Sequence, residues 1–159
     1  MTTLREIIEI PLPAKAVEES LLRYLESRRG ADGTMSLPLR VPLSDFGIPS
    51  GLGVEHTVQV RVNRRRDEDN LNDEFAIAWK PEKDGSYPAF SGRIIVWSEG
   101  DPGAAYIELR GTYEPPLGTA GLLFDAALGT AIARSTARRL LEDLREGVLT
   151  MRRASVGNQ

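Results

Sequence analysis

Apolar and polar residues alternate along most of the chain before residue 114, and this period of two is typical of β-strands with one buried face. The alternation is clearest between Val54 and Val62, where valines and His56 occupy every second position. The pattern predicts strands at Leu4–Leu12, Met35–Leu43, Val54–Val62, Glu74–Lys80, Phe90–Glu99 and Ala105–Tyr113. Pro38 and Pro42 cannot donate to a sheet ladder, so Met35–Leu43 is expected to be an edge strand or an irregular extended segment.

The predicted strands follow one another with short connections, which favours an antiparallel sheet with helices on one side. Phe90–Glu99 has apolar residues on both parities, which predicts a central strand that is covered on both sides. The basic run Arg64–Arg66 is followed at once by the acidic run Asp67–Asp69. We therefore expect a solvated hairpin loop there and no contact with nucleic acid.

Two segments have the helical period instead. Ala14–Ser27 predicts an amphipathic helix, and a longer helix is predicted from about Thr119 to Val148, after a turn that contains two prolines. The buried stripe of the long helix is small at first and large afterwards: Ala126, Gly129, Ala133, Thr136 and Ala137, then Leu140, Leu144 and Val148. Small residues there indicate either close approach to the sheet or space for a ligand, and the sequence leaves both open.

The order of these elements predicts an α+β fold, in which an antiparallel curved sheet of about six strands grips the long C-terminal helix. A sheet curled around a helix usually encloses an apolar ligand cavity. The length of 159 residues fits one domain. We expect that domain to cover residues 1–149, with a polar C-terminal tail at residues 150–159.

Composition excludes several classes of site. The net charge of −3 argues against a nucleic-acid-binding protein, because neutralising phosphates requires a basic face. The chain has no cysteine and one histidine, so we expect no disulfide, no metal and no cofactor. No apolar run reaches the roughly 18 residues of a transmembrane helix, and MTTLREIIEI does not resemble a signal peptide. The expected location is the cytoplasm.

The opening EIIEIPLPAKAVEESLLRYL and the closing GTYEPPLGTAGLLFDAALGTAIARSTARRLLEDL resemble the two ends of the helix-grip fold of the START-related lipid-binding superfamily. This superfamily, also called SRPBCC, includes polyketide cyclases and plant pathogenesis-related proteins. Between the two ends only the number of predicted strands is similar. The segment ESRRGADGTMSLP lacks the second short helix that is usual in the family. The resemblance implies a small hydrophobic ligand, either a lipid or an aromatic, polyketide-like molecule, although the fold alone does not settle function.

Several side chains are candidates for the wall of such a cavity. His56 shares the apolar parity of its strand, and its alternative role is a hydrogen-bonded histidine near the sheet edge. Asp125 lies near the start of the long helix, where a negative charge is also favoured for structural reasons. Tyr113 is expected in the core or at the cavity mouth. The full set of candidates is His56, Val58, Phe75, Ile77, Trp79, Tyr113, Asp125, Gly129, Ala133 and Thr136.

Three functions remain open at this point. The first is the binding or carrying of a small hydrophobic molecule between sheet and helix. The second is a cyclase- or hydratase-like enzyme, which would require convergence among His56, Asp125, Tyr113 and Arg93, although Arg93 is expected at a solvated edge position. The third is an interaction protein with a filled core. Its homodimer contact would use Phe124 and Leu128, which otherwise pack on the first helix.

Overall fold

The computed structural model describes residues 2–32, 35–40, 55–66, 73–79, 89–114 and 126–158. The helices in these ranges are α1 (Ala14–Ser27) and α2 (Ala126–Val156). The strands are β1 (Thr2–Ile10), β2 (Met35–Arg40), β3 (Glu55–Arg66), β4 (Asp73–Trp79), β5 (Ala89–Trp97) and β6 (Ala105–Glu114).

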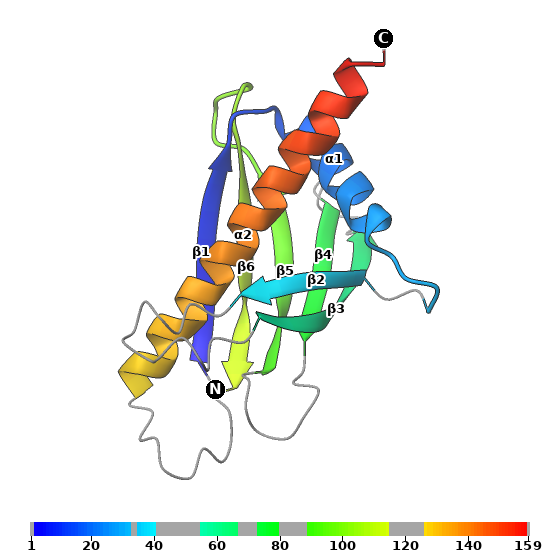
Figure 1. Ribbon diagram of the computed structural model, residues 1–159. Coiled ribbons are helices and arrows are strands. Elements are labelled where there is room, and N and C mark those ends of the chain that lie inside the picture. Colours follow the sequence, from blue (N-terminus) through cyan, green and yellow to red (C-terminus); the bar gives the residue numbers. More distant parts are fainter. Residues whose placement is uncertain are drawn as a thin grey trace.

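The described strands form one sheet in the order β1-β6-β5-β4-β3-β2, and every neighbouring pair is antiparallel. The first strand therefore lies beside the last one, while β2 forms the far edge. Figure 1 shows α2 laid across the sheet, with α1 beside its C-terminal half. The predicted α+β class, the antiparallel sheet and the long helix against it are confirmed. The edge position of β2 agrees with the proline in that strand.

The sheet has an inner face, which looks toward the helices, and an outer face on the opposite side. The buried inner-face side chains include Leu4, Ile10, Phe75, Ile77, Ile94, Val96, Ile107 and Leu109. β5 is central, as predicted, but the prediction that both its sides are covered is wrong, because Ser91 and Arg93 on the outer face are exposed. The apolar residues of β5 that point to the outer face belong to a local surface patch, in which Trp97 stacks on Tyr106.

The register places two glycines directly opposite each other in the middle of the sheet. Gly92 on β5 pairs with Gly111 on β6, and the ring of Phe90 lies over both. A Cβ atom added at Gly92 or Gly111 would lie 2.7 Å or 2.6 Å from the Cζ atom of Phe90. These positions therefore have no room for a side chain, and the two glycines allow the Phe90 ring to approach the backbone closely.

Two boundaries differ from the prediction. Arg64–Arg66, predicted as a hairpin loop, continues strand β3, where Arg64 pairs with Phe75 and Arg66 with Asp73. Helix α2 extends past the predicted end at Val148 to Val156, so most of the predicted polar tail is helical. In this last part the Ser155 hydroxyl donates to the carbonyl of Met151. The predicted first residues of the long helix, 119–125, lie outside the described residues.

α2 buries one face along the sheet and along α1. Its buried residues include Ala133, Thr136, Ala137, Leu140, Leu141, Leu144 and Val148. Further along, a Cβ atom at Gly147 would lie 2.5 Å to 2.7 Å from ring atoms of Tyr24 on α1. Glycine therefore allows the two helices to approach closely at this point.

Candidate functional site

Three aromatic residues lie side by side on the inner face of the sheet. Trp79 on β4 is opposite Phe90 on β5, and Phe90 is opposite Tyr113 on β6. We call these three residues the aromatic row, and each is at most 5% exposed. The rings of Trp79 and Phe90 stack with centroids 4.3 Å apart and planes 18° apart. The row forms a largely apolar wall on the inner face.

The row results from strand direction and parity. Trp79 is the last residue of β4 and Phe90 the second residue of β5, and an antiparallel connection places such positions opposite each other. Along each strand the next inner-face residue lies two positions away, which brings Ile77, Gly92 and Gly111 into the neighbouring row. Because the glycines have no side chains, the Phe90 ring can lie over them.

Polar atoms are sparse on this wall, and two of them belong to the aromatic row. The Tyr113 hydroxyl lies 3.2 Å from the Thr130 hydroxyl, which connects β6 to the first half of α2. The indole N–H of Trp79 is buried and has no hydrogen-bond partner among the described residues. A mostly apolar surface with a few polar groups is typical of small-molecule sites.

Six of the predicted ligand residues are buried, and all of them except Thr136 belong to one hydrophobic core. Four lie on the sheet and two on α2: Phe75, Ile77, Trp79, Tyr113, Ala133 and Thr136. His56 and Val58 belong to β3, where their backbones pair with Leu39 and Leu37, but their side chains lie outside the described set. Gly129 is described only as helix backbone, and Asp125 is not described.

The enzyme hypothesis requires Arg93 to lie close to the other candidate acid–base residues, and it does not lie close to Tyr113. Its guanidinium lies on the outer face, 3.4 Å from the Glu74 carboxylate, whereas Tyr113 faces inward. The predicted solvent exposure of Arg93 is confirmed, but its predicted edge position is wrong, because β5 is a central strand. Arg93 and Tyr113 therefore cannot serve one site.

Phe90 was not among the predicted site residues, although it contacts Trp79 directly. Its parity with Ile94 and Val96 was a usable signal for the inner face. The contact with Trp79 depends on the register of β4 against β5, which one strand pattern does not contain. Thr130 was missed for the same reason, since only the fold brings it to Tyr113.

Among the described side chains, each face of the sheet carries one buried carboxylate. Glu6 on the inner face accepts a hydrogen bond of 2.8 Å from Arg134 of α2, and Arg138 lies 4.0 Å away. Glu108 on the outer face is 3% exposed and accepts hydrogen bonds from Arg5 on β1 and from Arg110 on its own strand. The hydrogen bonds from Arg5, and then those from Arg110, hold the pKa of Glu108 below its usual range despite its burial. Both carboxylates are paired, so neither is available as a general base.

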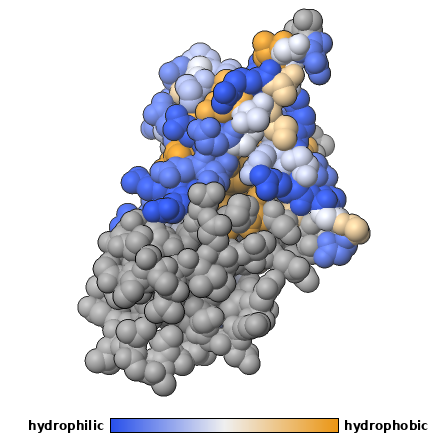
Figure 2. All heavy atoms as spheres, viewed as in Figure 1, coloured by the Kyte–Doolittle hydropathy of each residue, from blue (hydrophilic) through white to orange (hydrophobic). Residues whose placement is uncertain are grey.

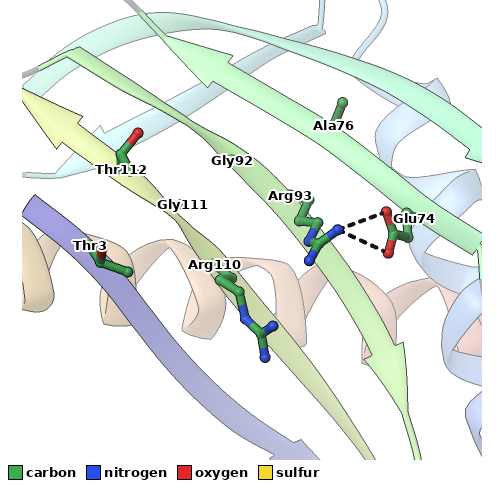
Figure 3. Close-up of a pocket in the computed structure, with 8 residues that line it drawn as sticks. All are labelled: Thr3, Glu74, Ala76, Gly92, Arg93, Arg110, Gly111 and Thr112. Carbon is green, nitrogen blue, oxygen red and sulfur yellow. Dashed lines mark hydrogen bonds and ion pairs between the residues drawn. The ribbon is translucent and has the colours of Figure 1, made fainter.

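The outer face also contains a groove of about 390 Å³. It is lined by Thr3, Glu74, Ala76, Gly92, Arg93, Arg110, Gly111 and Thr112. Figure 3 shows Arg93 pointing toward Glu74, with Thr3 and Thr112 farther along the same face. The groove contains none of the predicted ligand residues, and the helices lie on the other side of the sheet.

A second hollow of about 410 Å³ lies between the two helices. Its lining residues are Tyr24, Ser27, Arg28, Asp143, Glu146, Gly147, Thr150 and Met151. Arg28 lies over the Tyr24 ring at 5.3 Å from the centroid, and three of the eight lining residues, Arg28, Asp143 and Glu146, are charged. This hollow contains none of the predicted ligand residues.

The described surface has few exposed apolar side chains. Figure 2 shows a mixed and largely hydrophilic surface over the helices. Among the described residues, the one large apolar side chain that is exposed is Val156, at 62%. The predicted homodimer ridge at Phe124 and Leu128 falls on side chains outside the described set, and the dimer stays a prediction.

Two kinds of feature are absent from the described ranges, a membrane-spanning helix and a metal-binding cluster. Neither described helix is both long enough and apolar enough to cross a membrane. In the same ranges, no three His, Asp or Glu side chains are grouped so that they could hold a metal ion. The expected absence of metal and cofactor remains a prediction.

Comparison with known proteins gives similarity in structure but not in sequence. No family model matches this chain, and no curated protein sequence matches it. A Thermus thermophilus protein of known structure is similar at a TM-score of 0.52 and 22% identity, over 94% of this chain and 98% of that one. A START superfamily protein from Mycobacterium smegmatis is similar at a TM-score of 0.53 and 11% identity, over 94% of this chain and 98% of that one.

The Zhui aromatase/cyclase from a Streptomyces species is similar at a TM-score of 0.52 and 13% identity, over 98% of this chain and 95% of that one. Together these similarities confirm the resemblance to the START-related superfamily at the level of the helix-grip fold. At such identities the similarity concerns the fold alone.

Proposed function

We propose that this protein binds a small, mostly apolar molecule between the inner face of the sheet and α2. The observation that carries the proposal is the aromatic row, which places three rings in line on the face that α2 covers. Aromatic walls bind flat or chain-like apolar molecules through large contact areas. The Tyr113 and Thr130 hydroxyls at the end of the row supply a polar contact that orients the ligand.

The preferred ligand is a lipid or an aromatic, polyketide-like molecule, carried by one domain over residues 1–149 in the cytoplasm. The remaining candidates, His56, Val58, Asp125 and Gly129, complete the wall in this proposal. The ligand is the expected partner, and nucleic acid is not.

The enzyme alternative has less support from the described residues. The similar Streptomyces protein is an aromatase/cyclase. In this chain, however, Glu6 is paired with Arg134 and Arg93 faces the opposite side of the sheet. Acid–base chemistry on the inner face would therefore depend on Tyr113, His56 and Asp125.

The proposal is tested by filling the space next to α2. Ala133 is buried one helical turn after Thr130, and the Ala133→Leu variant adds bulk at that place. If the site holds a ligand, stability changes little or rises, because each added buried methylene contributes about 0.8 kcal/mol. Binding of an apolar fluorescent dye then falls. If the interior is fully packed, the same change costs roughly 1–3 kcal/mol.

Thermal melts with and without dye measure both effects, and Val156→Leu at an exposed helix position is the control. Native mass spectrometry of protein purified from its own host then identifies any molecule that co-purifies. No dye binding by the unmodified protein, together with a large loss of stability in Ala133→Leu, would refute the proposed function and favour an interaction protein with a filled core.

A further inference from the structure

The inner wall contains a hydrogen-bond donor that has no acceptor among the described residues. Trp79 is 5% exposed, and its indole N–H has no partner among the described residues. Buried polar groups are nearly always hydrogen-bonded, and an unmade bond destabilises the protein. An indole N–H can only donate, so the missing partner must be an acceptor.

The position of the ring limits where that partner can lie. One face of the Trp79 ring is covered by Phe90, whose centroid is 4.3 Å away in a nearly parallel plane. The N–H bond lies in the plane of the indole, so the stacking leaves its direction open. Tyr113 is two strands away and directs its hydroxyl to Thr130, and therefore does not satisfy the Trp79 donor.

We propose that the ligand presents an acceptor oxygen, of the carbonyl or ether kind, to the indole N–H of Trp79. This inference rests on the proposed function and deepens it, because it selects a chemical class among apolar molecules. This class comprises molecules that have a flat apolar body and carry a ketone, quinone or aryl ether oxygen. A pure hydrocarbon would fill the same space but leave the donor unpaired.

The chain offers a matched control in its second tryptophan. Trp97 also has a buried indole N–H without a partner among the described residues, and it also stacks on an aromatic ring, that of Tyr106. Trp97 lies on the outer face of the sheet, away from the helices. The Trp79→Phe and Trp97→Phe variants therefore remove the same donor from opposite faces while keeping an aromatic ring.

The test uses two probes of the same shape, the ketone 1-tetralone and the hydrocarbon tetralin. Calorimetric titration gives the ratio of their dissociation constants for the unmodified protein and for both variants. We expect Trp79→Phe to lower the preference for the ketone by about threefold to tenfold, the size of one hydrogen bond. Trp97→Phe should leave the ratio unchanged.

A second measurement on the unmodified protein does not depend on the folding of a variant. The chain has two tryptophans, so a ¹H–¹⁵N spectrum shows two indole signals, which Trp97→Phe assigns. Saturation with 1-tetralone should move the Trp79 signal downfield and leave the Trp97 signal in place, whereas tetralin should not produce this shift.

The outcomes separate the two proposals. If both probes bind and their ratio is the same in all three proteins, or the Trp79 signal does not move, the inference is overturned while the proposed function stands. If neither probe nor the apolar dye binds, the proposed function fails, and this inference fails with it.

Discussion

Both faces of the sheet carry a tryptophan stacked on a second aromatic ring, and the two pairs have nearly the same geometry. On the inner face Trp79 and Phe90 stack at 4.3 Å and 18°, and on the outer face Trp97 and Tyr106 stack at 4.6 Å and 23°. The inner pair is buried, whereas the outer pair is only partly covered. The helix layer, and not the stacking itself, therefore makes one pair a candidate ligand wall and leaves the other a surface patch.

The buried carboxylates differ in a similar way. Glu6 on the inner face is bonded by Arg134, which reaches from α2 and is 65% exposed. Glu108 on the outer face is covered by Arg5 from the neighbouring strand and by Arg110 from its own strand. No described helix lies over Glu108, so the long stems of the arginines must provide its burial.

The largest expected effect tests whether the inner pair is part of the packed interior. Phe90→Ala removes a buried ring that covers two glycines, and should lower the free energy of unfolding by about 3–5 kcal/mol. Tyr106→Ala on the outer face should cost about 1 kcal/mol, because that ring is partly exposed. Urea unfolding of both variants measures the difference. Similar losses from both variants would contradict the distinction between the faces.

A smaller effect is expected from the carboxylates. Glu108→Gln leaves Arg5 and Arg110 directly opposite each other without their shared anion, and should cost about 1–3 kcal/mol. Glu6→Gln should cost about 1 kcal/mol or less, because the exposed Arg134 can turn into solvent. Chemical denaturation at neutral pH compares the two variants. A greater loss from Glu6→Gln would show that the inner ion pair is the stronger one.

The smallest expected effect is a change in the unfolding free energy at acidic pH. Because the pKa of Glu108 is lowered in the folded protein, its carboxylate contributes stability above its ordinary pKa of 4.5. This contribution is lost as the pH falls through the lowered folded-state value. The difference in unfolding free energy between the unmodified protein and Glu108→Gln should therefore be constant near neutral pH and shrink below about pH 4.5. A difference that does not change down to about pH 3 would refute this assignment.

Much of the fold could be predicted from local patterns. The period of two placed Leu4, Phe75 and Ile77 on one face, and the helical period gave Ala14–Ser27 with its observed bounds. These predictions succeed because the periodic pattern reflects which side of a strand or helix is buried. The pattern can be seen within one short segment of the sequence. The resemblance at the two ends of the chain correctly indicated the helix-grip fold.

The rest depends on contacts that no single segment contains. The apolar residues on the outer parity of β5 were interpreted as a second covered side, whereas Trp97 is stacked on the neighbouring strand. Arg64–Arg66 looked like a loop because of its charge, but pairing with β4 holds it in a strand. Phe90 belongs to the site because the register of β4 against β5 places it opposite Trp79. Arg93 does not belong to it, because successive residues of a strand point to opposite faces and Arg93 lies on the outer one.

The pairing of β1 with β6 has a consequence for how the protein is made. Thr2 lies opposite Tyr113, so the first of these strands to be synthesised finds its permanent neighbour only after nearly all of the sheet has emerged from the ribosome. Until then β1 lacks the strand beside which it lies in the folded sheet. Contacts between residues so distant in sequence slow folding and lengthen the exposure of unpaired edges. The pairing of β1 with β6 is therefore expected to be a late step in the formation of the sheet.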